Sequence, residues 1–267
     1  MRVAAVQMTS TDDVAANLAA ARKHVADAAA LGAGLVALPE NFAFLRREGE
    51  PIPCAQGLDG EIAGTLRELA REHRIWLLGG TFPEAAGAEG RVHNTALAID
   101  PEGRVAAVYR KIHLFDVDLS AQGGLVYRES DRVAPGAGIA HVETPFGGIG
   151  LSVCYDLRFP ELYRALAARG VRFLAVPAAF ARETGRDHWE VLLRARAIEN
   201  QAFVIAAAQV GEHGGGRASY GRSMIVDPWG LVLARAPDVP GPIVAECRLE
   251  EQDRIRTALP ALRHRRL

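Results

Sequence analysis

An order of predicted elements that occurs twice is the feature that most restricts the fold of this chain. Each half begins with a strand, a helix, a strand, a helix and a strand, and closes with a two-strand hairpin. The segments predicted in the first half are 1–8, 11–31, 35–38, 62–70, 75–81, 94–99 and 105–109. Their counterparts in the second half are 149–154, 160–168, 171–177, 188–199, 203–209, 223–226 and 231–235. The chain therefore contains two units of one plan.

The two units predict a layered α/β fold. Helix 11–31, which Thr11 or Asp12 can cap, has apolar residues at spacings of three and four, so one of its faces is buried. A sheet covered by helices on one face can bury its other face against a second sheet. We therefore predict a four-layer α-β-β-α sandwich of two mixed sheets with an internal pseudo-twofold repeat. No linker separates the halves, so residues 1–267 are expected to form a single domain.

Two segments fall outside the repeated pattern. Residues 116–138 are polar, contain several glycines and have no clear period. They are predicted to form a long loop, and long loops in compact domains are often functional. Residues 211–216 are predicted to form a glycine-rich surface loop, which lacks the sequence of a phosphate-binding loop.

Composition excludes several classes of function. The 267 residues carry a net charge of −1, which does not indicate a surface for nucleic acid or membranes. Three cysteines do not suggest a disulfide framework and favour a reducing compartment. The chain enters a strand without the pattern of a signal peptide, and no apolar run has membrane-spanning length. We therefore expect a cytoplasmic protein.

Cys154 is a candidate nucleophile because of its place between two elements. The strand over 149–154 ends at this residue, and Pro160 marks the start of the next helix. Ligands of layered α/β folds bind at the carboxyl ends of strands. The following helix start favours a thiolate and a developing oxyanion. The alternative is that Cys154 is a small buried apolar residue, as many intracellular cysteines are.

Two charged residues also end apolar strands. Glu40 follows the strand over 35–38, and Lys111 follows the strand over 105–109. A thiol nucleophile needs a base, which Glu40 can supply, and Lys111 with the Tyr155 backbone N–H can stabilise an oxyanion. The alternative is a Glu40–Lys111 ion pair unrelated to Cys154.

Three motifs resemble those of the nitrilase superfamily of carbon–nitrogen hydrolases. They are Pro39-Glu40-Asn41, Tyr109-Arg110-Lys111-Ile112-His113-Leu114-Phe115 and Cys154-Tyr155-Asp156-Leu157-Arg158-Phe159-Pro160-Glu161. The resemblance implies that Glu40 is the general base, Lys111 the oxyanion stabiliser and Cys154 the nucleophile that forms a thioester. It also implies a second catalytic glutamate, Glu129, an α-β-β-α fold and a homodimer that associates face to face.

Segments 188–199 and 218–230 look like those of the branch that hydrolyses deaminated glutathione. That reaction separates an α-ketoglutarate-like acyl group from cysteinylglycine. The sister ω-amidase branch, which takes α-ketoglutaramate and α-ketosuccinamate, shares most motifs and is the main alternative. Less favoured are a nitrilase proper, a carbamoylase and a binding protein that has lost catalysis.

Both candidate substrates are small amides that bear an α-keto acid, and its carboxylate needs a cation. Arg158 follows Cys154 by four residues and can bind this carboxylate, or it can pair with an acid such as Asp156 in the core. Tyr155, Phe180 and Thr184 are further candidates for the substrate pocket, with the last two placed in a loop.

No metal or cofactor is expected. The histidines are scattered along the chain, and His113, His188 and His213 do not have ligand spacings with one another. His188 and Trp189, at a predicted helix start, are interpreted as packing and capping groups, and Arg194 and Arg196 as members of structural ion pairs.

Overall fold

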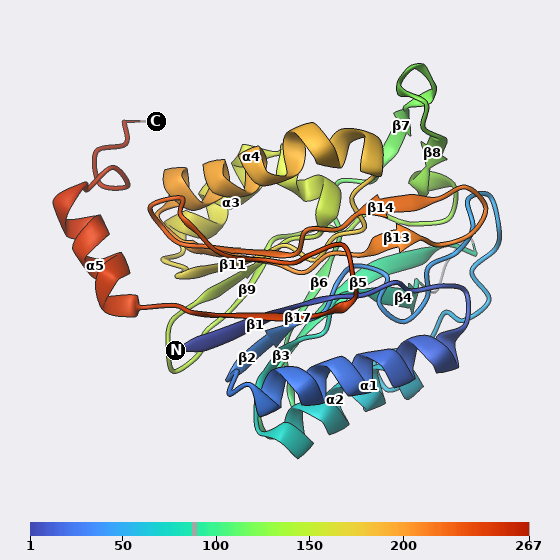
Figure 1. Cartoon of the computed structure of the whole chain (residues 1–267), viewed down its shortest axis with the longest axis horizontal. Helices are drawn as coiled ribbons and strands as arrows, with labels where there is room; N and C mark the ends of the chain where they lie inside the picture. The colour runs from blue at the N-terminus through green and yellow to red at the C-terminus, as the bar shows by residue number, and fades with distance from the viewer. Residues whose placement is uncertain (87–89, 267) are drawn as a thin grey trace.

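The computed structural model describes residues 1–86 and 90–266. Figure 1 shows two stacked sheets between two layers of helices, with α1 and α2 on one side and α3 and α4 on the other. The four-layer α-β-β-α sandwich predicted from the repeat is therefore confirmed. No helix within the described ranges is long and apolar enough to cross a membrane.

The first sheet has seven strands in the order β17-β1-β2-β3-β5-β4, and β6 also pairs with β5. Strands β1, β2 and β3 are parallel to one another, whereas β17 and β5 are antiparallel to their neighbours. Helices α1 and α2 cover its outer face. The bounds are β1 (Arg2–Gln7), α1 (Val14–Ala30), β2 (Leu35–Ala37), α2 (Glu61–His73), β3 (Trp76–Leu78), β4 (Phe82–Ala85), β5 (Val92–Ile99), β6 (Val105–Arg110) and β17 (Gly241–Glu246).

The second sheet has six strands in the order β16-β15-β12-β11-β10-β9. Here β10, β11 and β12 are parallel, and β9 and β15 are antiparallel to their neighbours. Helices α3 and α4 cover this sheet. The bounds are β9 (Ala140–Val142), β10 (Ile149–Leu151), α3 (Pro160–Ala168), β11 (Phe173–Ala175), α4 (Arg182–Asn200), β12 (Phe203–Ala206), β15 (Met224–Val226) and β16 (Val232–Arg235).

Six strands of the first sheet match the six strands of the second in order and direction, and β4 is the additional strand of the first sheet. The path β17-β1-β2-β3-β5-β6 has the same directions as β9-β10-β11-β12-β15-β16. Both outer hairpins even contain a register shift, between Ala98 and Ile99 in one and between Ile225 and Val226 in the other. The matched edge strands β9 and β17 differ in their place in the chain, because β9 precedes β10 whereas β17 returns to β1 from the C-terminal region.

Side-chain alternation along β1 shows how the layers are held. Val3 and Ala5 belong to the cluster between the sheets, whereas Ala4 and Val6 pack toward α1 and α2. All four are fully buried. A shift of one residue in the pairing of β1 would exchange these two faces, so the apolar pattern fixes the register.

Several element boundaries differ from the sequence prediction. Asp13, rather than Thr11 or Asp12, caps α1, since its side chain accepts a hydrogen bond from the Ala16 N–H. Helix α4 begins at Arg182, six residues before the predicted start. Its first turns, residues 182–187, contain no apolar face that would predict a helix, and Gly185 there packs against the side chain of Tyr220. Thr184 therefore lies in a helix and not in a loop.

Both irregular segments contain strands that the sequence pattern did not indicate. Residues 116–138 include the pair β7 (Asp116–Asp118) and β8 (Val126–Arg128). Residues 211–216 lie mostly in the turn of a hairpin formed by β13 (Val210–Glu212) and β14 (Ala218–Tyr220). Helix α5 (Leu249–Ala258) and strand β17 were also not predicted.

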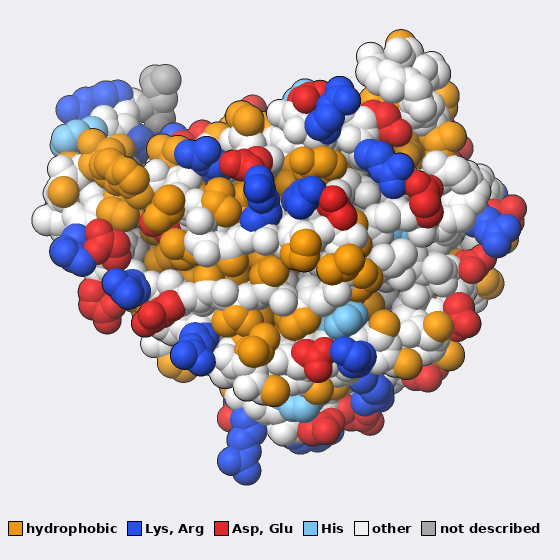
Figure 2. Space-filling view, in the orientation of Figure 1, with side chains coloured by type: hydrophobic (Ala, Val, Ile, Leu, Met, Phe, Trp, Pro, Cys, Tyr) orange, Lys and Arg blue, Asp and Glu red, His pale blue; other side chains and the backbone are white. Residues whose placement is uncertain are grey.

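Charged side chains of both signs are interspersed on the face shown in Figure 2. Hydrophobic side chains form a broken band across its middle, between the two helical layers. This face has no extended patch of a single sign, in keeping with the net charge of −1.

Candidate active site

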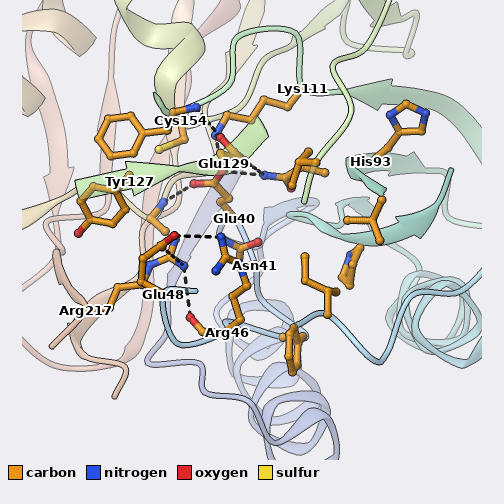
Figure 3. A pocket seen from close by; sticks show the side chains of 18 residues that line it. Glu40, Asn41, Arg46, Glu48, His93, Lys111, Tyr127, Glu129, Cys154 and Arg217 are labelled. Atoms are coloured by element: carbon orange, nitrogen blue, oxygen red, sulfur yellow. Dashed lines mark hydrogen bonds and ion pairs between the residues drawn. The ribbon is translucent and has the colours of Figure 1, made fainter. Parts of the chain in front are cut away.

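Glu40, Lys111 and Cys154 converge from both sheets. Glu40 follows β2 and Lys111 follows β6 in the first sheet, and Cys154 follows β10 in the second. Their exposed fractions are 3%, 2% and 7%. Figure 3 shows the three side chains turned toward one another in one pocket. Strands β2 and β6 both run parallel to β3. The ends of β2 and β6 that lead into Glu40 and Lys111 therefore lie at the same edge of the first sheet.

Lys111 lies between two carboxylates. Its Nζ is 3.0 Å from Glu40 Oε1 and 2.8 Å from Glu129 Oε2. Burial alone would lower the pKa of Lys111, but the charges of Glu129 and Glu40 raise it well above its ordinary value. The ammonium is therefore charged at neutral pH. Because it has three N–H donors and two contact the carboxylates, one remains for a ligand.

Glu40 is held as a carboxylate by several donors. Oε2 accepts a hydrogen bond from the Ala179 N–H at 2.8 Å, and Oε1 accepts one from Asn94 Nδ2 at 2.9 Å. Burial alone would raise the pKa of Glu40, but Lys111, the Cys154 thiol and the Ala179 N–H hold it below its ordinary value. A buried carboxylate in contact with a thiol is placed to act as its base.

The Cys154 backbone has a left-handed conformation, with φ of 49°, which is uncommon for a residue other than glycine. Its N–H donates to the Pro177 carbonyl at 2.9 Å, which fixes this conformation. Burial and the charge of Glu40 raise the pKa of the thiol well above its ordinary value. This direction is opposite to the one expected from a following helix start, because burial and Glu40 favour the thiol, and a short 3₁₀ helix, Cys154–Arg158, separates Cys154 from α3.

Asp156 connects the segment after Cys154 to the segment after Lys111. Its carboxylate is fully buried and accepts hydrogen bonds from Tyr109 Oη at 2.7 Å, the Val153 N–H at 2.8 Å and the His113 N–H at 3.1 Å. Nδ1 of His113 is 2.7 Å from the same carboxylate. This set of contacts leaves Asp156 without an ion pair to Arg158, which was one of the two roles considered for that arginine.

Glu129 and Asn94 complete the buried network. Glu129 follows β8 directly and accepts hydrogen bonds from the Phe115 N–H at 2.6 Å and from Asn94 Nδ2 at 3.3 Å. Asn94 thus bridges Glu40 and Glu129, while its buried Oδ1 has no partner within the described part of the chain. The sequence analysis did not select Asn94, because an asparagine at the start of a strand has no distinguishing pattern.

Two cavities contain Cys154. The larger encloses about 670 Å³, its open mouth included, and extends from Glu40, Lys111 and Glu129 to Arg46 and Arg217. The smaller is lined by Tyr155, Phe180 and Thr184, so three of the four predicted substrate-binding residues lie beside the sulfur. Arg46, Glu48 and Arg217 were not predicted, since they lie in segments with no period or motif.

Arg158 lines neither of these cavities. Its guanidinium lies over the Phe180 ring, 5.0 Å from the centroid, and its Nη1 is 3.2 Å from His188 Nδ1. Trp189 is fully buried and donates to the Arg222 carbonyl, so it is a packing residue, as interpreted from the sequence. The described residues contain no group of three potential metal ligands.

Arg194 and Arg196 form the structural contacts predicted for them. Arg194 pairs with Glu190 at 3.6 Å, and Arg196 pairs with Glu199 at 2.9 Å. Both pairs lie along α4, so neither arginine is part of the cavity that contains Lys111.

Comparison with known proteins agrees with this geometry. Residues 2–257 match the family model described as carbon-nitrogen hydrolase. A protein of Synechocystis named deaminated glutathione amidase is 45% identical over 265 residues, covering 98% of this chain and 97% of that protein. The human protein of the same name is 45% identical over 269 residues, covering 99% of this chain and 82% of its own length.

Solved structures agree as well. The Caenorhabditis elegans NitFhit protein superimposes with a TM-score of 0.91 and 42% identity, covering 99% of this chain and 65% of that longer chain. Saccharomyces cerevisiae Nit3, described as a member of branch 10 of the nitrilase superfamily, superimposes with a TM-score of 0.87 and 30% identity, covering 100% of this chain and 97% of its own. This chain therefore belongs to the carbon–nitrogen hydrolase family, the nitrilase superfamily.

Proposed function

We propose that this protein is a thiol-dependent amidase that hydrolyses the amide of deaminated glutathione to α-ketoglutarate and cysteinylglycine. The observation that carries the proposal is the buried contact of Lys111 with Glu40 in the pocket that the buried Cys154 also lines. Relatives named deaminated glutathione amidase, 45% identical over nearly the whole chain, support the choice of substrate.

In the first step, Glu40 accepts the thiol proton as the sulfur of Cys154 attacks the amide carbonyl carbon. Charge develops on the carbonyl oxygen, which the free N–H of Lys111 and the Tyr155 backbone N–H stabilise. No hydrogen bond from the Tyr155 N–H is found among the residues that the structure describes. Glu40 then returns the proton to the leaving nitrogen as the C–N bond breaks, and an acyl thioester remains on Cys154.

In the second step, water replaces the departed amine. Glu40 accepts a proton from this water, and the hydroxyl oxygen attacks the thioester carbonyl. The same two donors stabilise the oxyanion, the C–S bond breaks, and the proton returns to the sulfur. The products are a carboxylic acid and the free thiol, so the cycle consumes one water for each amide.

We assign Glu129 to the orientation of Lys111. Its carboxylate contacts Nζ at 2.8 Å and is itself held by the Phe115 N–H. Glu40 and Glu129 together fix two of the three ammonium donors, so the third has one direction left. This role differs from proton transfer, which the contact of Glu40 with the thiol assigns to Glu40.

The residues that line the smaller cavity are proposed to contact the acyl group next to Cys154. Tyr155, Phe180 and Thr184 line this cavity together with Cys154. Arg158, stacked behind Phe180, adds positive charge near the α-keto carboxylate without lining the cavity. The ω-amidase reaction uses the same acyl group and is therefore the second candidate.

Product release from two substrates tests the proposal. We expect much faster α-ketoglutarate formation from deaminated glutathione than from α-ketoglutaramate, measured in parallel at equal enzyme concentration. A preference for α-ketoglutaramate, with release of ammonia, would assign the protein to ω-amidases instead. No hydrolysis of either would refute the proposed substrate class.

We further propose a cytoplasmic homodimer. The three cysteines are free thiols, as a reducing compartment favours. Val191 of α4 is 66% exposed, and Trp229 and Leu231 of the β15–β16 turn are 63% and 60% exposed, which provides apolar surface on the α4 side of the sandwich. Light scattering should report a dimer for the wild type and a monomer for the double variant Val191→Glu, Trp229→Glu. A monomeric wild type would contradict the proposal.

A further inference from the structure

The larger cavity ends in a cluster of two arginines and one glutamate: Arg46, Glu48 and Arg217. Arg46 Nη2 is 3.1 Å from Glu48 Oε1, and Arg217 Nη1 is 3.8 Å from Glu48 Oε2. The side chains are 10%, 19% and 17% exposed. Figure 3 shows this arginine cluster at the opposite end of the pocket from Cys154 and Lys111. It is therefore a recessed cationic group in the cavity that holds the reactive sulfur.

The arginine cluster has hydrogen-bond donors to spare. Each guanidinium carries five N–H donors. Arg46 donates to the Arg47 carbonyl and to Glu48, and Arg217 donates to the Arg46 carbonyl at 3.3 Å. These are the hydrogen bonds of the two guanidinium groups within the described ranges. Two positive charges face one carboxylate, so the cluster carries a net charge of +1 and can bind a further anion.

Three separate segments hold the arginine cluster in place. Arg46 follows the strand-end segment of Glu40, and Arg217 lies in the β13–β14 hairpin with its guanidinium 5.9 Å from the centroid of Tyr127 on β8. The turn of this hairpin packs closely on the loop that carries Arg46. A Cβ atom added to Gly215, whose φ is 59°, would lie 3.1 Å from Arg47 Cβ.

The charges at the other end of the cavity explain why an anionic substrate needs this cluster. Within residues 1–86 and 90–266, Lys111 is the cation that pairs with Glu40 and Glu129, so the reacting end carries a net charge of −1 while the Cys154 thiol is neutral. A substrate carboxylate would be repelled by that end. Arg46 and Arg217 are the cavity-lining cations that are not enclosed by the catalytic carboxylates.

We propose that Arg46 and Arg217 bind a carboxylate of the substrate and so select anionic amides over neutral ones. This inference rests on the proposed amidase function and adds a recognition site to it. Deaminated glutathione offers two carboxylates, one on the α-keto acyl group and one on the terminal glycine. The shared chemistry is a carboxylate bound by guanidinium groups in a partly desolvated site, where such hydrogen bonds are strong.

Steady-state kinetics of Arg46→Gln and Arg217→Gln test the site. Arg254→Gln is the matched control, because this arginine lies on α5 and its side chain is 76% exposed. We expect KM for deaminated glutathione to rise roughly tenfold or more in both pocket variants, with kcat within about threefold of the wild type. Arg217→Lys keeps the positive charge but loses the paired N–H donors of the guanidinium group, so its KM should lie between those of the wild type and Arg217→Gln.

Two further substrates identify the carboxylate. If the terminal glycine is bound, the C-terminal carboxamide of deaminated glutathione has a raised KM already in the wild type, and the variants add nothing to it. If the α-keto carboxylate is bound by Arg46 and Arg217 instead of lying near Arg158, KM for α-ketoglutaramate rises in the variants as well. If the arginine variants left KM unchanged for both deaminated glutathione and α-ketoglutaramate, or lowered kcat alone, the proposal would be overturned.

A binding measurement separates this proposal from the proposed reaction. Calorimetry on Cys154→Ala with α-ketoglutarate and with cysteinylglycine reports carboxylate binding without turnover. Loss of binding of either ligand on adding Arg217→Gln supports the site even if the wild type fails to hydrolyse deaminated glutathione. Equal binding of both ligands with and without Arg217→Gln overturns the site even if hydrolysis is fast.

Discussion

The two ends of the larger cavity are built differently. At the inner end, Glu40, Lys111 and Cys154 follow buried strands, and their polar atoms are held by backbone groups and by one another. At the outer end, Arg46 and Arg217 lie in a loop and a hairpin, and their donors are only partly used. The first arrangement keeps reacting atoms in fixed positions, and the second leaves cations free for a ligand.

This difference assigns chemistry and recognition to separate parts of the fold. The inner end depends on strands that the core holds rigid, as proton transfer between fixed groups requires. The outer end depends on connecting segments, which commonly carry specificity. We therefore expect changes at the inner end to lower kcat and changes at the outer end to raise KM.

The largest effect is expected for Cys154→Ala, because the nucleophile itself is removed. Turnover should fall at least a thousandfold, as in other enzymes that lose a covalent nucleophile. Cys247→Ala is the matched control, since Cys247 is a fully buried cysteine at the end of β17, away from the cavity. Hydrolysis rates measure the effect, and circular dichroism spectra equal to that of the wild type show that the variants are folded. If Cys154→Ala retained one tenth of the activity, a thioester mechanism would be excluded.

Lys111→Met removes the proposed oxyanion donor. We expect kcat to fall roughly a hundredfold or more, the cost of other lost oxyanion donors. The change also leaves Glu40 and Glu129 without their cation, so the thermal midpoint should fall. Lys23→Met, at an exposed pair with Asp27, is the control. If Lys111→Met kept its kcat and lost only stability, Lys111 would be structural.

Asn94→Ala tests whether turnover depends on the hydrogen bonds that Asn94 donates to Glu40 and Glu129. Both carboxylates lose a hydrogen bond from Nδ2, so kcat should fall roughly tenfold with little change in KM. Asn200→Ala is the control, because Asn200 is also buried with an unpartnered Oδ1 but lies at the end of α4. The acid limb of the kcat/KM profile should also move to higher pH in Asn94→Ala, because Glu40 loses a donor that favours its ionised form. Equal effects of the two alanine variants would count against a role for Asn94.

His213, near the outer end of the cavity, should make the free energy of unfolding decrease in acid. Burial lowers its pKa to about 4, and it lies between the Ser10 carbonyl and Ser219 Oγ in the hairpin of Arg217. The unfolded chain binds this proton from about pH 6.5 downward. The stability due to neutral His213 is therefore complete above pH 6.5 and decreases as the pH falls toward 4.

At pH 5 this loss amounts to about 2 kcal/mol of unfolding free energy, from 1.36 kcal/mol for each pH unit between about 6.5 and 5. Urea unfolding at pH 7 and pH 5 measures it. His213→Gln should show a smaller difference between the two pH values than the wild type, whereas His264→Gln, at an exposed position, should not. An identical pH response of His213→Gln and the wild type would contradict this assignment.

The parts of the site that the sequence predicts are those where a charge ends an apolar strand. Glu40 and Lys111 stand out because a buried strand rarely ends in a charged residue without a partner. Glu129 followed only from the family resemblance. Arg46, Glu48 and Arg217 could not be predicted, since charged residues in polar segments are usually solvated and only the folded chain brings them together.

The fold shows the same division between local and long-range information. The repeated order of strands and helices predicted both sheets and both helical layers. Strand β17 was missed because its pairing with β1 joins residues more than 230 positions apart in sequence, as in the pair Gln7 and Gly241. The start of α4 was missed because Gly185 lies against Tyr220, a packing arrangement that no local period reveals.

Trapping of the acyl enzyme tests the central claim most directly. Rapid acid quench of the wild type with excess deaminated glutathione, followed by mass spectrometry of peptides, should show the α-ketoglutaryl group on Cys154 and nowhere else. The adduct should form before α-ketoglutarate accumulates and should be absent in Cys154→Ala. Hydrolysis that proceeds with no such adduct, or an adduct on another residue, would contradict the account.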